Sequence, residues 1–239
     1  MPIEIGHIEA IFRHPVKSMA GQQVEAANLG WHGIDGDRRL AFRRMNDRSG
    51  FPWLTATKVP ELLLFTPRSN GEELPTHICI PDGKDLPTFS EELAEEVGRL
   101  YGSPVEMMEM KHGIFDDASI SVIASDTVRE IGRLVGLNLD VRRFRPNILV
   151  RLSHPGAFQE DQWVGGVLSF GDENAPAVSV TMRDLRCAML NLDPDTAKPN
   201  SEVMKTVFSV NENNAGIYGT VIRTGRLEVG QTVFFHAET

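Results

Sequence analysis

Short apolar segments separated by turn residues recur along this 239-residue chain, a pattern typical of β-strands. Residues 3–12 alternate in part between apolar and polar side chains, and residues 40–42 and 62–65 are compact apolar runs. In residues 77–80 the alternation places Cys79 on one face and two isoleucines on the other. We therefore interpret Cys79 as a packing residue, since unpaired cysteines are usually buried.

Two segments show the apolar spacing of helices instead. The first follows a Pro-Asp-Gly turn at residues 81–83, has Ser90 as its expected N-cap, and is stopped by Gly102 and Pro104. Its apolar face consists of Leu93, Val97, Leu100 and Tyr101. The second is expected to start near Ser125 or Asp126 and to end at Gly136, with Val128, Ile131, Leu134 and Val135 turned inward.

Further strands are predicted at residues 120–124, 147–151, 167–170, 177–182, 217–222 and 229–235. The chain contains no internal repeat and no low-complexity tract. These patterns predict a mainly β protein with a few helices, in the α+β class. We place a change of domain in the helical connection around residues 88–110, giving domains 1–95 and 96–239.

Composition and charge limit the cellular compartment and the binding partners that we expect for this protein. No apolar run approaches the roughly 20 residues of a membrane helix, and the N-terminus lacks a signal-peptide pattern. Two cysteines without such a signal argue for a reducing compartment, so we expect a cytoplasmic protein. The net charge of −9 argues against nonspecific binding to nucleic acid or to an anionic membrane.

Arginines nevertheless gather at two places in this acidic chain. Arg142, Arg143 and Arg145 form one group, and Arg38 and Arg39 form another. Such a group can be a solvated face with carboxylate partners. It can also bind phosphate, because the guanidinium fork matches phosphate oxygens in two parallel hydrogen bonds. The residues alone leave both interpretations open.

The second cysteine, Cys187, lies in the segment Arg186-Cys187-Ala188-Met189-Leu190, followed by Asn-Leu-Asp-Pro-Asp-Thr. One interpretation is a small buried apolar residue. The other is a thiolate, which is a soft ligand for transition metals and a reactive nucleophile.

The Arg-Cys segment with Asp-Pro-Asp-Thr resembles the MOSC family, the domain shared with the C-terminal part of molybdenum cofactor sulfurases. Further segments follow in the order of that family: residues 14–18 (HPVKS), 36–38 (GDR), 117–119 (DAS), 144–148 (FRPNI), 215–219 (AGIYG) and 225–233. The resemblance spans nearly the whole chain. It implies an N-terminal β-barrel-like domain followed by a β-barrel MOSC domain, similar to the mitochondrial amidoxime reducing component and its bacterial relatives.

The resemblance also implies a molybdenum cofactor (molybdopterin) and a set of residues around it. Cys187 would be the thiolate ligand to molybdenum and the catalytic residue. The residues expected to contact the pterin or its phosphate are Lys17, Ser18, Arg38, Asp117, Ser119, Arg145, Asn147, Arg186 and Tyr218. Without the resemblance, the local sequence would also allow Lys17 to be a solvated turn lysine and Tyr218 to be a core aromatic residue.

The chain departs from its relatives at two positions near these motifs. They place small hydroxyl residues where this chain has Ala118 and Leu185, and each lost hydroxyl removes at most one hydrogen bond, about 0.5–1.5 kcal/mol. Glycine-rich phosphate loops, HExxH, paired CxxC and serine nucleophile elbows are missing from the sequence. Pyridoxal phosphate would need a Schiff-base lysine in an apolar pocket, and the sequence does not single out such a lysine. This cofactor is therefore not supported.

The implied activity is reduction of N-oxygenated compounds, such as hydroxylamines and amidoximes, by oxygen-atom transfer. Oxygen transfer involving sulfur or a small oxyanion is a related possibility. The alternatives are a non-catalytic protein that binds or delivers the cofactor, and a sulfur carrier that uses Cys187. Two cysteines cannot hold a [2Fe–2S] cluster, and no dinucleotide-binding motif is present. We therefore expect a separate electron donor, a ferredoxin-, flavodoxin- or haem-type carrier with its own reductase.

Overall fold

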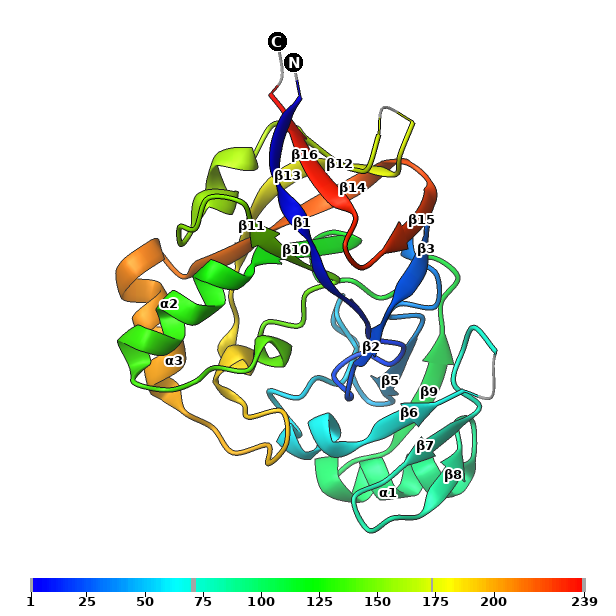
Figure 1. Ribbon diagram of the computed structural model, residues 1–239. Helices are drawn as coiled ribbons and strands as arrows, with labels where there is room; N and C mark the ends of the chain where they lie inside the picture. Colours follow the sequence, from blue (N-terminus) through cyan, green and yellow to red (C-terminus); the bar gives the residue numbers. More distant parts are fainter. Residues whose placement is uncertain (1, 70–71, 173, 238–239) are drawn as a thin grey trace.

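The computed structural model describes residues 2–69, 72–172 and 174–237, and its largest element is a closed barrel of seven strands (Figure 1). The barrel strands are β1 (Ile3–Arg13), β10 (Ile120–Ala124), β11 (Ile148–Leu152), β12 (Val167–Phe170), β13 (Ala177–Leu185), β14 (Asn214–Arg223) and β16 (Thr232–His236). Neighbours pair in the order β11-β10-β14-β13-β12-β16-β1, and β1 also pairs with β11, which closes the ring. The first strand of the chain therefore belongs to a barrel made mostly from its second half.

Shorter strands surround the barrel and build a second body beside it (Figure 1). Near the barrel, β2 (Gln22–Val24) pairs with β1, and β15 (Gly225–Glu228), β3 (Ala26–Gly30) and β4 (Gly33–Ile34) form a small sheet. The second body contains β5 (Leu40–Arg44) with β9 (Val105–Glu109), and the three-stranded sheet of β6 (Thr66–Arg68), β7 (His77–Cys79) and β8 (Asp85–Pro87). The predicted mainly β class is confirmed.

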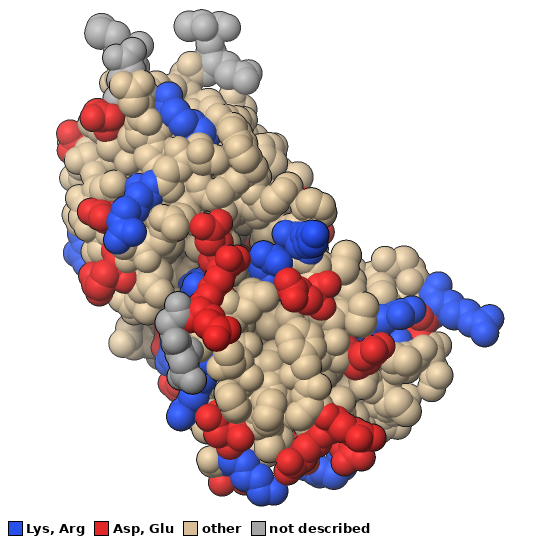
Figure 2. Space-filling view, turned by 90° about the vertical axis from the view of Figure 1, so that its right-hand side faces the viewer, with Lys and Arg blue, Asp and Glu red and all other residues tan. Residues whose placement is uncertain are grey.

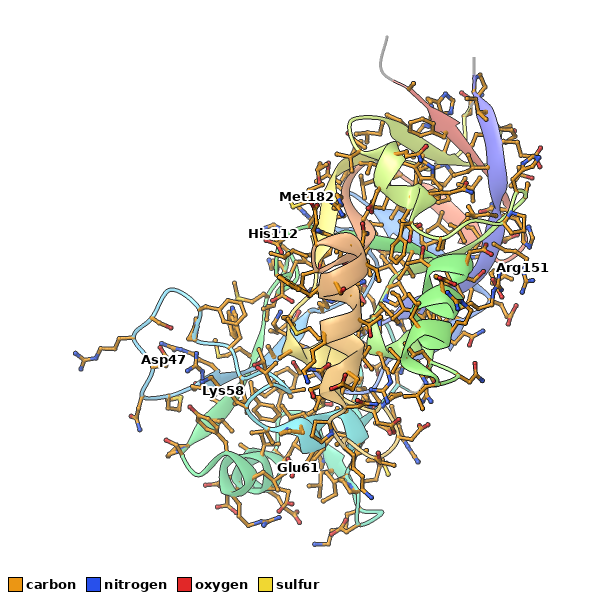
Figure 3. All side chains as sticks on the ribbon, turned by 90° about the vertical axis from the view of Figure 1, so that its left-hand side faces the viewer. Asp47, Lys58, Glu61, His112, Arg151 and Met182 are labelled. Atoms are coloured by element: carbon orange, nitrogen blue, oxygen red, sulfur yellow. The ribbon has the colours of Figure 1, made fainter. Side chains whose placement is uncertain are left out.

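The described residues contain three α-helices: α1 (Glu91–Tyr101), α2 (Ser125–Val135) and α3 (Ser201–Asn211). The Ser90 side chain caps α1, and Gly102 ends it in the left-handed conformation, as predicted. In Figure 3, α2 (green) and α3 (orange) lie along the outside of the barrel. None of the helices in the described residues is long and apolar enough to span a bilayer.

Four apolar clusters hold these layers together. The barrel interior is filled by inward residues such as Ile8, Val122 and Phe170, and the second body packs around Phe65 and Leu93. A third cluster joins the two outer helices to the barrel wall through Ile123, Val128, Ile131, Val203 and Val207. The fourth consists of Ala56 and Leu63 from the second body and Leu192 from the segment after β13, and it fixes one end of the barrel against the second body.

Two local predictions were wrong, and one helix was missed. Residues 62–65 are not a strand: Pro60–Leu64 is a 3-10 helix, because a short apolar run fits either form and Pro60 cannot donate to a sheet. Leu134 is 42 % exposed although α2 forms as predicted. Helix α3 was not predicted, because Phe208 and Val210 lie on its exposed side and blur its apolar stripe.

Candidate functional site

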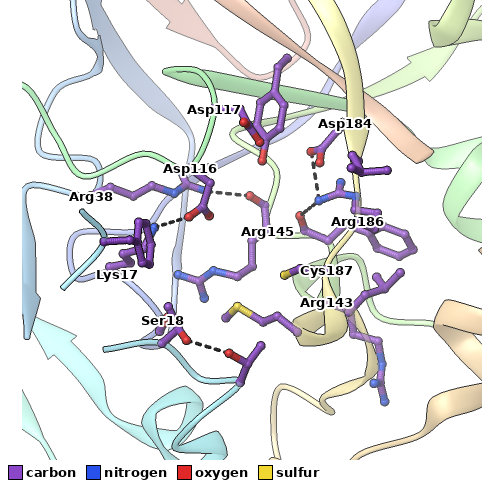
Figure 4. A pocket seen from close by; sticks show the side chains of 18 residues that line it. Lys17, Ser18, Arg38, Asp116, Asp117, Arg143, Arg145, Asp184, Arg186 and Cys187 are labelled. Carbon is purple, nitrogen blue, oxygen red and sulfur yellow. Dashed lines mark hydrogen bonds and ion pairs between the residues drawn. The ribbon is translucent and has the colours of Figure 1, made fainter. Parts of the chain in front are cut away.

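A pocket of about 400 Å³ opens where the barrel meets the second body (Figure 4). Predicted site residues from six separate motifs line it: Lys17, Ser18, Arg38, Asp117, Arg145, Arg186, Cys187 and Tyr218. Strand β1 carries its motif to this place because β1 pairs with β11, so the segments after β1 and before β11 lie side by side. The barrel closure thus gathers residues that are far apart in sequence.

Arg145 points its guanidinium group into the centre of the pocket (Figure 4). Its Nη1 donates to the Met19 carbonyl at 2.6 Å, whereas its buried Nη2 has no hydrogen-bond partner in the described residues. Burial, together with the nearby charge of Arg38, lowers the pKa of Arg145 to about 9. A buried cation without a carboxylate partner is costly, so this position favours an anionic ligand.

Arg38 lines the pocket and is anchored from behind it. It forms an ion pair with the buried Asp37, and its Nη2 donates to the Arg145 carbonyl at 2.9 Å. The turn before it needs Gly36, whose φ is +76° and whose added Cβ would lie 2.6 Å from the Glu73 carbonyl oxygen. This turn therefore fixes where the Arg38 side chain enters the pocket.

Lys17 is buried, in contrast to the solvated turn lysine that its residues alone allowed. Its Nζ donates to Asp116 at 2.8 Å and to the Ile114 carbonyl at 3.2 Å, and it lies 5.4 Å from the centre of the Phe51 ring. Burial lowers the pKa of Lys17, and the charge of Asp116 opposes that shift. Lys17 thus adds a third fixed positive charge to the pocket, beside Arg145 and Arg38.

Arg186 and Cys187 follow the end of β13. Arg186 donates to the carbonyls of Ala215 and Phe144 and pairs with Asp184 at 3.0 Å. Its buried Nη2 has no partner among the residues that the structure describes. Cys187 is an exposed free thiol on the pocket wall, next to the 3-10 turn Ala188–Asn191. The thiol of Cys187 is therefore open to a ligand in the pocket, and the alternative of a buried packing cysteine does not fit its exposure.

The backbone is strained at three of the predicted residues. Ser18, Arg38 and Arg145 have φ values of 67°, 47° and 49°, in the left-handed region that disfavours residues with a Cβ. Such strain is maintained only where the surrounding structure demands it, and it concentrates at functional sites. All three residues line the same pocket.

Two predicted residues, Ser119 and Asn147, do not line the pocket. Asn147 is buried behind it, where its amide donates to Asp37 at 3.1 Å and its oxygen accepts from the Ser121 backbone at 3.1 Å. Asn147 thereby holds the acid that anchors Arg38. The backbone of Ser119 packs against the turn at Gly33.

Several residues that line the pocket were not among the predicted site residues. Asp116 and Asp184 are acids, and Phe51, Thr55, Thr57 and Met189 add surface at its mouth. Arg143, treated with Arg142 as one group, has a buried side chain paired with Asp193 at 2.8 Å. Arg142 instead pairs with Asp140 and Asp195 at the surface. Asp184 lies outside the sequence motifs, so no motif marks it as a pocket residue.

The pocket contrasts in charge with the molecule as a whole. Its wall contains five basic and three acidic side chains in a chain of net charge −9. On the face drawn in Figure 2, acidic and basic side chains are mixed. The pocket concentrates positive charge beside an open thiol, which suits a ligand that combines an anionic group with a soft metal centre.

Fold and site together define a barrel protein with a cation-lined pocket and an open cysteine at the meeting point of two bodies. The chain belongs to the MOSC family: residues 5–111 match the MOSC N-terminal beta barrel domain, and residues 109–234 match the MOSC domain. Members of this family bind the molybdenum cofactor. The change of domain between residues 95 and 96 stays a prediction.

Among solved structures, the YUAD protein shows the same fold at low sequence identity. The YUAD protein from Bacillus subtilis is 14 % identical, with a TM-score of 0.55 and full coverage of both chains. YiiM from Geobacillus stearothermophilus is 18 % identical over 50 % of this chain and 55 % of its own, with a TM-score of 0.39. A search of curated protein sequences found no match.

Proposed function

We propose that this protein is a molybdenum-cofactor-dependent oxidoreductase that reduces N-oxygenated compounds such as hydroxylamines and amidoximes. One observation carries the proposal: the open thiol of Cys187 shares a pocket with guanidinium nitrogens of Arg145 and Arg186 that have no hydrogen-bond partner within the described part of the chain. Buried donors without partners fit a ligand that supplies acceptor oxygens. A pterin phosphate supplies such oxygens, and a thiolate suits molybdenum.

The residues of the pocket divide the binding work between them. Arg145, Arg38 and Lys17 would hold the phosphate, Ser18 lies beside them, and Arg186 would add a further donor. The pterin ring would be hydrogen-bonded by Asp117 and Tyr218. Cys187 would ligate the metal. When bound, the cofactor supplies the redox-active metal that accepts the substrate oxygen.

The chain's own contribution is to orient the ligand and to exclude water from its deeper side. The strained turns at Arg38 and Arg145 fix two guanidinium groups before any ligand binds, which reduces the entropy lost on binding. Phe51 and Met189 give the pocket an apolar rim. Asn147 stays in the proposal as a residue that positions Arg38 through Asp37.

Electrons would come from a separate carrier of the ferredoxin, flavodoxin or haem type. The chain has two cysteines, Cys79 and Cys187, and four are needed for a [2Fe–2S] cluster. We propose that such a carrier, with its own reductase, docks on this protein for each turnover.

The test is expression in a host that makes the cofactor, followed by metal analysis and by fluorescence of the released, oxidised pterin. Reduction of benzamidoxime to benzamidine is then assayed with an added carrier and reductase. The proposal predicts molybdenum, pterin and turnover together. Molybdenum and pterin without turnover would favour a delivery protein, and a persulfide on Cys187 with neither would favour a sulfur carrier.

A further inference from the structure

A buried carboxylic acid, Asp184, forms part of the pocket wall. It lies near the end of β13, its side chain is 1 % exposed, and it lines the pocket together with Cys187. One carboxyl oxygen, Oδ2, accepts from the Ser121 hydroxyl at 3.0 Å and pairs with Arg186 at 3.0 Å. The other oxygen, Oδ1, is buried and has no partner in the described residues.

The two oxygens have different surroundings, and a carboxyl oxygen that carries the proton becomes a donor. With its proton on Oδ1, the acid still accepts from Ser121 and Arg186 at Oδ2, and its O–H group meets no acceptor among the described residues, so it is available to a ligand in the pocket. Figure 4 shows Asp184 and Arg186 joined on one side of the pocket, with Cys187 below them.

Four groups face this carboxyl. Ser121 from β10 and Arg186 from the segment after β13 contact it directly. Tyr218 from β14, through a hydrogen bond, and Arg38 from the turn before β5, through its charge, also favour the ionised form. Burial raises the pKa of Asp184 to about 6 in spite of both arginines. Both protonation states are therefore accessible near neutral pH, as proton transfer requires.

We propose that Asp184 is a proton donor for the reaction in this pocket, an inference that rests on the proposed reductase function. Reduction of a hydroxylamine takes two electrons and two protons. The N–O bond breaks, one proton goes to nitrogen, and the other goes to the oxygen that leaves as water. The electrons come from the reduced carrier.

During this reduction, the Asp184 carboxyl gives up one of the two protons and becomes a carboxylate. Arg186 and Ser121 then stabilise the charge. Water at the pocket mouth returns a proton to Asp184 before the next transfer. The pairing with Arg186 therefore stabilises the state formed after proton donation, whereas burial favours the state before it.

The test compares Asp184→Asn with Asp184→Glu and with the surface control Asp195→Asn, whose carboxylate pairs with Arg142 outside the pocket. Infrared difference spectra of the cofactor-free chain between pH 5 and 8 report the carbonyl stretch of a protonated acid. A band that is lost near pH 6 should be present in the wild type and in Asp195→Asn, and missing in Asp184→Asn. Circular dichroism checks that each variant folds.

In the loaded protein, kcat of the wild type should fall as the pH rises through about 6, because the protonated acid is the active form. Asp184→Asn should lose this dependence and about 100-fold in kcat, and Asp184→Glu should recover part of both. Wild-type kcat and pH profile in Asp184→Asn, or no titrating band, would overturn the assignment of Asp184. A wild type without turnover would instead overturn the proposed function, and with it proton donation to that substrate.

Discussion

At the scale of single residues, Arg145 is the group whose surroundings say most about the ligand. Its charge is buried, it is repelled by Arg38, and its Nη2 has no partner in the ranges 2–69, 72–172 and 174–237. Arg142, three residues earlier, pairs with two surface aspartates and faces solvent. Arg145 can therefore bind an anionic ligand, whereas the charge of Arg142 is already neutralised by its two aspartate partners.

We predict that Arg145→Glu reduces pterin content per polypeptide by at least about tenfold after identical purification, since a charge-assisted hydrogen bond is worth about 1.5–3 kcal/mol. The matched variant Arg142→Glu should retain close to the wild-type content. Content is measured by fluorescence of the released, oxidised pterin. Equal losses in the two variants would mean that Arg145 has no special contact with the cofactor.

Which site residues could be predicted depended on whether they belong to a motif. The motif residues Lys17, Arg145 and Cys187 reach one pocket, because the barrel brings their segments together. A motif does not reveal the direction of a side chain, so Asn147 was assigned to the ligand although it points at Asp37. Asp184 belongs to none of the motifs, and only its burial and its unpaired oxygen mark it.

At the scale of elements, helix α2 shows how a buried acid replaces a missing cap. Its N-cap position is Ala124, which has no capping side chain. The carboxylate of Glu160 accepts from the Ala124 backbone at 3.2 Å and from the Thr127 hydroxyl at 2.8 Å. Burial raises the pKa of Glu160 to about 7.

This shift predicts a pH-dependent stability. Since the folded-state pKa lies above the unfolded value of 4.5, the folded protein binds the proton more tightly, and the free energy of unfolding falls as the pH rises from about 4.5 to about 7. The change attributable to Glu160 is at most about 3 kcal/mol. Urea unfolding at several pH values should show a flatter profile in Glu160→Gln. An unchanged slope would show that Glu160 does not titrate in this range.

The elements also show why some of the fold escaped prediction. Helix α1 follows its apolar spacing and caps, so local signals were sufficient. Helix α3 buries Val203 and Val207 but leaves Phe208 69 % exposed, so its position depends on packing against α2 rather than on its own pattern. Closure of the barrel by β1 and β11 joins residues more than 130 positions apart, and local periodicity carries no information about such pairs.

At the scale of the whole molecule, the described structure has a cation-lined pocket between two bodies. The chain has two cysteines, fewer than the four that bind a [2Fe–2S] cluster. We predict that the purified, cofactor-loaded chain does not reduce benzamidoxime with reduced nicotinamide alone. Addition of a carrier and its reductase should give steady formation of benzamidine. Steady turnover from the chain and nicotinamide alone would contradict the need for a partner.

The most direct measurement is X-ray absorption at the molybdenum edge of loaded wild type, Cys187→Ala and the control Cys79→Ala. Cys187 is an exposed pocket thiol, whereas Cys79 lies in β7 and lines no part of this pocket. We predict that molybdenum has one fewer sulfur ligand in Cys187→Ala, and that this variant folds but loses activity. Cys79→Ala should keep the wild-type coordination and activity. Equal sulfur coordination of molybdenum in all three proteins would contradict the assignment of Cys187 as the metal ligand.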